Sequence, residues 1–128
     1  YNFPKNKFVA NFIGDANVVK AEIVNKQSNS YELKLAEMKI KIESDKDLKN
    51  SVSVALRPEK IRIETTNNDN CIHASINNAS FVGSSYQYIL NSKIGKLYVI
   101  SGDTNNPFKV GEEVFLSLDE KDVKILND

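Results

Sequence analysis

The sequence of 128 residues has no tryptophan and contains only one cysteine, one methionine and one histidine. With Cys71 alone, no intramolecular disulfide can form, which is typical of proteins in a reducing compartment such as the bacterial cytoplasm. No apolar run approaches the roughly 18 residues that a membrane-spanning helix needs, and the first residues lack the pattern of a signal peptide. We therefore expect a soluble chain that depends on another component if it works at a membrane.

An excess of either charge is also missing, because Lys+Arg and Asp+Glu both total 17 and the formal net charge is zero. A protein that binds nucleic acid by neutralising phosphates normally carries a basic excess. We therefore expect no nucleic-acid partner. The length suits one compact domain or two very small ones, and it allows enough burial that a disulfide or metal is not needed for stability.

Residues that carry chemistry are sparse. The five glycines do not form a phosphate-binding loop, and a lone His73 with a lone Cys71 cannot supply the four ligands of a usual zinc site. We interpret His73 as a surface residue of a strand. The acidic group Glu43, Asp45 and Asp47 is interpreted as a solvated turn, with a weak calcium site as the alternative. The sequence thus predicts no catalytic, cofactor-binding or metal-binding residues in this chain.

One short segment, Pro4 to Gly14, has a helical pattern. Pro4 suits the first turn of a helix, and Gly14 suits a left-handed residue at its end. Phe8 and Phe12 stand four residues apart, so both would lie on one apolar face. We predict a short helix here, with Phe8 and Phe12 as candidate interface residues against a neighbouring domain.

From Asn17 onward, apolar residues alternate with polar ones, which predicts strands with one buried face. Segments rich in turn-forming residues separate these stretches. Many short antiparallel strands at this spacing favour a barrel or a sandwich. The predicted strands are 18–24, 31–35, 38–42, 51–56, 61–63, 72–76, 86–90, 96–100, 114–118 and 123–125.

The second half of the chain repeats the pattern of the first. Residues 72–76 match residues 19–23 in their apolar positions, and each half ends in a strand, a short turn and a strand. We predict an all-β fold built from two similar halves, about 15–66 and 67–128, forming small barrels of the oligonucleotide-binding type that can share strands.

Two sets of polar or aromatic residues are candidates for binding. Tyr86, Tyr88 and Tyr98 could stack on bases, but with balanced charge we favour cross-strand packing in the core. The turn Leu56-Arg57-Pro58-Glu59 places a permanent cation and a carboxylate around a rigid proline between two strands. Arg57 can bind a carboxylate or carbonyl in a bidentate manner, and Glu59 can orient it; the alternative is a turn with a weak surface ion pair.

Several segments together resemble a family. Residues 4–14, followed by Asn17, resemble the junction at the end of the ATPase domain in ATP-binding subunits of ABC importers. Leu56-Arg57-Pro58-Glu59-Lys60-Ile61 resembles the hallmark of the transport-associated barrel domain of these subunits. Residues 111–118 and 123–126 resemble the closing strands of that domain, so the resemblance covers nearly the whole chain.

The resemblance implies that residues 1–14 are a junction helix from the end of a missing ATPase domain and that residues 15–128 are a regulatory domain. It implies that ATP and Mg²⁺ bind only in the missing domain, because the phosphate-binding loop is absent here. It also implies a second copy of the ATPase subunit and membrane permease subunits as partners, at the inner face of the bacterial cell membrane. Arg57, Glu59, Phe8 and Phe12 are the regulatory or interface candidates.

The transported solute is a finer expectation. Residues 12–17 and Arg57-Pro58-Glu59 are similar to the polyamine branch, with spermidine/putrescine import as the first choice. Import of ferric ion or an anion is the alternative, because the second half is shorter than in long polyamine-type barrels. A different class of function, a freestanding barrel that binds a small ligand or single-stranded nucleic acid, also remains open.

Overall fold

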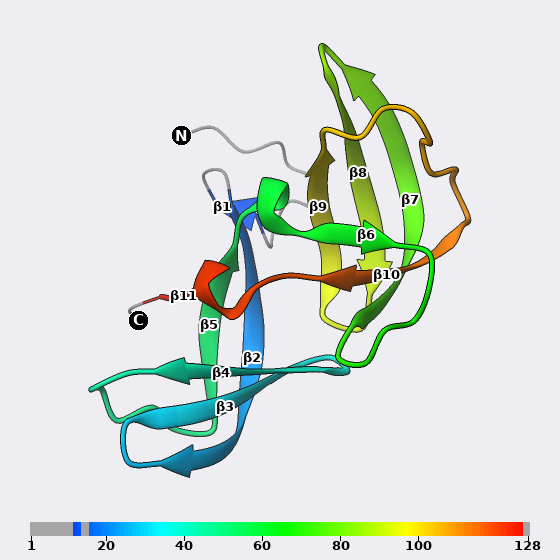
Figure 1. Ribbon diagram of the computed structural model, residues 1–128. Helices are drawn as coiled ribbons and strands as arrows, with labels where there is room; N and C mark the ends of the chain where they lie inside the picture. The colour runs from blue at the N-terminus through cyan, green and yellow to red at the C-terminus, as the bar shows by residue number, and fades with distance from the viewer. Residues whose placement is uncertain (1–11, 14–15, 127–128) are drawn as a thin grey trace.

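The computed structural model describes residues 12–13 and 16–126, which fold almost entirely as antiparallel strands (Figure 1). Two short 3-10 helices, η2 (Pro58–Lys60) and η3 (Glu120–Asp122), interrupt the strands. The strands are β1 (Phe12–Ile13), β2 (Ala16–Gln27), β3 (Ser30–Leu35), β4 (Met38–Glu43), β5 (Ser51–Leu56), β6 (Arg62–Glu64), β7 (Ile72–Val82), β8 (Ser85–Ser92), β9 (Gly95–Ser101), β10 (Glu113–Ser117) and β11 (Val123–Ile125).

The strands form two sheets of matching order. The first sheet runs β11-β5-β2-β3-β4, with β1 paired to the start of β2, and the second runs β6-β10-β7-β8-β9. Each sheet therefore has a central long strand, β2 or β7, that begins a hairpin toward one edge. The matching order confirms the predicted all-β fold of two similar halves.

The two halves exchange their last strands. β6 belongs to the first half of the sequence but pairs with β10 in the second sheet, with Leu116 opposite Ile63. β11 belongs to the second half but pairs with β5 in the first sheet, with Val123 opposite Leu56. Neither sheet is complete without a strand from the other half, as Figure 1 shows where β6 and β11 cross between them.

The same local irregularity occurs in both halves. A β-bulge lies between Ile23 and Asn25 in β2, and another lies between Ile76 and Asn78 in β7. A bulge increases the local twist of a strand, which bends the hairpin that follows. The repeated bulge is therefore expected to bend the β2–β3 and β7–β8 hairpins in a similar way.

The core follows from the alternation in the sequence. Residues at every second position of the strands point inward, and the apolar ones form a single buried cluster that draws on both sheets. The largest fully buried side chains are Tyr31, Tyr88, Leu33, Leu35, Met38, Ile40, Leu56, Ile72, Ile76, Leu90, Leu97 and Leu116.

The helix predicted at 4–14 is wrong where the structure describes it. Phe12 and Ile13 form the strand β1, and their backbones pair with Asn17 and Ala16 of β2. Pairing with a neighbouring strand has overridden the local helical spacing. The remainder of the predicted helix, including Phe8, lies outside the described residues.

Candidate functional site

The candidate turn lies where the chain crosses from the first sheet to the second. β5 ends at Leu56, and Pro58 fixes the first position of η2, where its missing N–H costs no hydrogen bond. Lys60 N donates to Arg57 O over 3.0 Å, which closes the turn. Pro58 is buried, and η2 packs against β9, so the turn is held rigidly by the second sheet.

Both charged residues of the turn point outward. Arg57 and Glu59 are exposed on either side of the buried Pro58. Among the residues that the structure describes, neither side chain makes a hydrogen bond or an ion pair, so the ion pair considered from the sequence is not formed. An exposed guanidinium on a rigid base is free to bind a carboxylate or carbonyl of another molecule.

Next to this turn, Asn17 joins the two sheets. Its side chain is buried, and its Nδ2 donates to Leu56 O over 3.1 Å and to Tyr98 O over 2.9 Å. Its Oδ1 accepts from Tyr98 N over 2.7 Å. The amide thus pairs with β9 as a residue of an adjacent strand would, although Asn17 belongs to the first sheet. It also fixes the end of the strand that leads to Arg57.

Asn70 occupies the corresponding position in the second half, and its side chain bonds to the backbone of the other edge strand, β4. Asn70 Oδ1 accepts from Lys39 N over 2.5 Å, and its Nδ2 donates to Lys39 O over 2.7 Å. Glu120 of η3 accepts from Lys41 N over 2.7 Å. Side chains therefore occupy the free edges of β4 and β9, which protects both edges from pairing with other chains.

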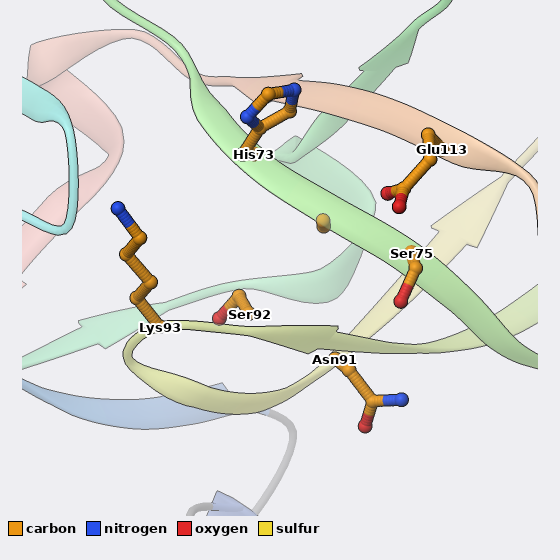
Figure 2. Close-up of a pocket in the computed structure, with 7 residues that line it drawn as sticks. His73, Ser75, Asn91, Ser92, Lys93 and Glu113 are labelled. Carbon is orange, nitrogen blue, oxygen red and sulfur yellow. The ribbon is translucent and has the colours of Figure 1, made fainter.

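A shallow pocket of about 500 Å³ lies on the outer face of the second sheet (Figure 2). It is lined by His73, Ala74, Ser75, Asn91, Ser92, Lys93 and Glu113. His73 and Glu113 come from β7 and β10, and Lys93 comes from the turn between β8 and β9.

The groups around this pocket do not form a catalytic arrangement. Glu37 Oε2 lies 3.9 Å from His73 Nδ1 and 3.8 Å from Lys93 Nζ, and all three side chains are at least one-third exposed. His73 stacks on Phe115 with ring centroids 4.5 Å apart, as a surface residue of β7. The Ser92 hydroxyl donates to Gly95 O over 2.6 Å, so it serves the turn and has no neighbouring base.

Among residues 12–13 and 16–126, no cluster of three or more His, Cys, Asp or Glu side chains is placed to hold a metal ion. Within the same residues, no helix has the length and apolar character to cross a membrane. Cys71 is buried just before β7.

Two tyrosines hold the long loops of the two halves. Tyr31 Oη donates to Lys46 O over 2.8 Å and accepts from Leu48 N over 3.1 Å. Tyr88 Oη accepts from Phe108 N over 3.0 Å, and burial raises the pKa of this hydroxyl. Tyr86 stacks on Tyr88 at 5.8 Å between centroids. Tyr88 is buried and Tyr86 is half-buried against the core, but both lie on β8, so this contact runs along one strand and is not the cross-strand pair predicted from the sequence.

A family model described as the TOBE domain matches residues 54–126, which is more than half of the chain. The match includes the Arg57 turn, both 3-10 helices and the exchanged strands. The chain belongs to the TOBE domain family. The match begins within β5, so β2, β3 and β4 of this TOBE domain lie outside the matched residues.

Relatives of this TOBE domain are import ATP-binding proteins. The chain is 22% identical over 99% of its length to "Fe(3+) ions import ATP-binding protein FbpC" of Agrobacterium fabrum, and 27% identical over its whole length to the protein of that name in Fusobacterium nucleatum. It is also 27% identical to "Spermidine/putrescine import ATP-binding protein PotA" of Ruegeria pomeroyi. The chain covers 36%, 34% and 36% of these proteins, so it spans about a third of their length.

A solved structure has the same fold. The cytoplasmic molybdate-binding protein ModG, crystallised with molybdate bound, superposes with a TM-score of 0.69 over 89% of this chain and 97% of ModG. The sequences are only 10% identical, so this likeness concerns the fold alone. It supports the predicted fold of the oligonucleotide-binding type.

Proposed function

We propose that this TOBE domain is the regulatory and dimerisation domain of the ATP-binding subunit of an ABC importer. In that protein a separate domain binds ATP and Mg²⁺, two subunits associate, and ATP hydrolysis drives solute uptake through permease subunits. The subunit works on the cytoplasmic side, peripheral to the inner face of the bacterial cell membrane. The fragment itself contributes contacts and no chemistry.

The observation that supports this proposal most directly is the extent of the similarity. Each import ATP-binding relative matches 99% or more of the chain, whereas the chain accounts for only about a third of each relative. A regulatory module attached to a larger ATPase has this relation to its parent. The absence of a phosphate-binding loop in the sequence agrees with a division of labour between the two parts.

The exposed turn is the part of the domain best suited to transmit a signal. Arg57 and Glu59 stand on a base fixed by Pro58, and that base follows β5 of the first sheet and packs on β9 of the second. A change in the position of a partner carboxylate against Arg57 would therefore act on the whole body of the domain. Arg57 and Glu59 are the residues we assign to this contact.

For the solute, ferric ion and polyamine are the two candidates. Ferric-import proteins recur among the relatives, while the sequence around residues 12–17 and the Arg57 turn is similar to the polyamine branch. We place ferric-ion import first on the recurrence and keep spermidine/putrescine import as the second candidate.

The test is transport by the intact gene product. Reconstituted with its permease subunits in vesicles, the subunit should drive ATP-dependent uptake of labelled ferric ion or labelled spermidine. Ferric uptake would support the first candidate, and spermidine uptake the second. A gene product without ATP-dependent uptake and without ATPase activity would contradict the importer assignment.

A freestanding ligand-binding or nucleic-acid-binding barrel is the function from another class. The likeness to nearly all of ModG shows that this fold can form a whole protein. Titration of the chain with labelled oligonucleotide at low salt, and with molybdate, distinguishes this possibility. A measurable affinity, salt-sensitive in the first case, would favour the freestanding reading.

A further inference from the structure

The β7–β8 hairpin is free of charge. Residues 74–92 contain no Asp, Glu, Lys or Arg, in a chain in which 27% of the residues are charged. The duplicated half provides an internal comparison, because residues 21–35 form the corresponding hairpin of the first sheet. That hairpin carries Glu22, Lys26, Glu32 and Lys34.

The tip of the β7–β8 hairpin is also apolar and exposed. Phe81 is 57% exposed and Val82 is 51% exposed, on opposite faces of the strand. Phe81 packs on Tyr86 with ring centroids 5.1 Å apart, and Tyr86 in turn packs on the buried Tyr88. A row of aromatic rings therefore leads from the core to solvent at the tip, which projects at the top of Figure 1.

The matching hairpin of the first sheet ends differently. Its Lys26 forms a 2.8 Å ion pair with Asp47, and its exposed apolar residue is the single Val24, 44% exposed. Both hairpins follow the same bulge, so the fold does not require the second one to be longer or apolar at its tip. The difference points to a role in contact with another molecule.

We propose that the tip of the β7–β8 hairpin, made of Phe81, Val82 and Tyr86, binds the same tip of a second copy of this chain across a two-fold axis. A residue that lies at such an axis faces its own copy, so a charge there would face a like charge. A different partner can supply opposite charges and does not require a charge-free surface. The zero net charge of the chain removes repulsion between whole copies as well.

Exposed aromatic residues suit the centre of such a contact, because they bury a large apolar area with little loss of side-chain entropy. The proposed function includes association of two subunits, and the inference places one contact of that association at the tip of the β7–β8 hairpin. It rests on the proposed function in this respect alone. Its test uses the 128-residue chain alone, so it can fail while the importer assignment stands.

The experiment is sedimentation velocity on the wild-type chain and on Phe81→Glu and Phe81→Lys. The wild-type chain should form dimers at micromolar concentration, and each charged variant should weaken the dimer at least tenfold. An equimolar mixture of the two variants should recover association, because opposite charges then meet across the axis. Recovery in the mixture is the result that identifies a two-fold contact at Phe81.

Val24→Glu is the matched control, because Val24 is the exposed apolar residue of the corresponding hairpin. It should leave the dimer unchanged, and thermal unfolding should show that all variants fold. A wild-type chain that stays monomeric at all concentrations would overturn the proposal. So would a Phe81→Glu variant that still dimerises, or a mixture of folded monomeric variants that does not associate.

Discussion

A single buried amide links the main chains of both sheets. The Asn17 side chain makes three hydrogen bonds to backbone groups of β5 and β9, and it is the polar residue within the described core. No isosteric apolar residue can make these bonds, and an aspartate would direct an oxygen at two carbonyl groups. The equivalent Asn70 makes two such bonds at an exposed site.

This arrangement predicts unequal costs for the two asparagines. Asn17→Ala removes the bonds of a buried amide to Leu56 O, Tyr98 O and Tyr98 N, so it should lower the free energy of unfolding by about 2–4 kcal/mol. Asn70→Gly should cost about 1 kcal/mol or less, because water can replace its bonds and glycine tolerates the φ of 72° at this position. Urea unfolding followed by circular dichroism measures both, and equal costs would contradict the bridging role of Asn17.

Arg57 is predicted to matter for function and not for folding. Its side chain is exposed and makes no hydrogen bond or ion pair within the described residues, so Arg57→Ala should change the free energy of unfolding by only about 0.5 kcal/mol. In the ATP-binding subunit that we propose as the parent protein, the same variant should reduce ATP-dependent uptake. Unchanged uptake together with a large fall in melting temperature would show that Arg57 is purely structural.

Pro58→Ala is the matched structural control for that experiment. Pro58 is buried and fixes the first position of η2, so its loss should lower the melting temperature while leaving the guanidinium in place. If Arg57→Ala lowers uptake but not the melting temperature, while Pro58→Ala lowers the melting temperature, the signalling role of Arg57 is distinguished from the folding role of Pro58.

At the scale of elements, each half fastens its long loop with one tyrosine. Tyr31 bonds to backbone groups of the β4–β5 loop, and Tyr88 accepts a bond from Phe108 N in the β9–β10 loop. These loops connect the β3–β4 hairpin to β5 and the β8–β9 hairpin to β10. The tyrosines therefore determine how firmly the hairpin and the following strand are joined.

The Tyr88 hydroxyl makes this fastening sensitive to alkaline pH. Burial raises its pKa in the folded chain above the ordinary value of 10.0, so the folded state holds the proton more tightly than the unfolded state. The stabilisation is fully present below pH 10 and is lost as pH rises through the raised pKa. Tyr88→Phe should flatten the fall in stability above pH 10 and cost about 1 kcal/mol at neutral pH.

Stability measured by urea unfolding at neutral pH and above pH 10 tests this prediction. Tyr86→Phe is the control, because Tyr86 contributes ring stacking and its ring is retained. A Tyr88→Phe chain whose stability falls with pH as steeply as the wild type would contradict the assignment.

The strands themselves were predictable, because a half-buried strand imposes alternation on its own sequence. β5 and β11 have the predicted bounds, and β3 and β4 differ by one residue at an end. β2 and β7 extend beyond the prediction, because the bulges shift the alternation at Ile23/Asn25 and Ile76/Asn78. Phe12 and Ile13 were misjudged as helical, since their pairing with Asn17 and Ala16 involves backbone groups that no side-chain pattern records.

Of the candidate site, the rigid turn could be predicted but its surroundings could not. Pro58 between two strands indicates a turn from the sequence alone, and the structure shows its charged neighbours exposed. The roles of Asn17 and Asn70 depend on edge strands that lie 81 and 31 residues away in the sequence. A signal was available, since Asn17 and Asn70 each stand two residues before the matching apolar segments 19–23 and 72–76, but repetition alone does not reveal a bonding partner.

At the scale of the whole molecule, the exchange of last strands joins the two halves into one folded unit. β6 and β11 complete the sheets of the opposite halves, Asn17 and Asn70 bond to the opposite edge strands, and η2 and η3 pack on β9 and β4. A contact at Arg57 or at the β7–β8 tip therefore acts on both sheets together. This coupling suits the regulatory role that we propose, because a signal received on one sheet would reach the other.

The most direct test of this interlocking is to divide the chain in the β6–β7 loop and study residues 1–66 and 67–128 separately and mixed. We predict that each fragment alone is unfolded, because it lacks the strand that completes its sheet and half of the shared core. The equimolar mixture should regain the circular dichroism and cooperative thermal unfolding of the intact chain. A fragment that folds stably and cooperatively alone would contradict the account.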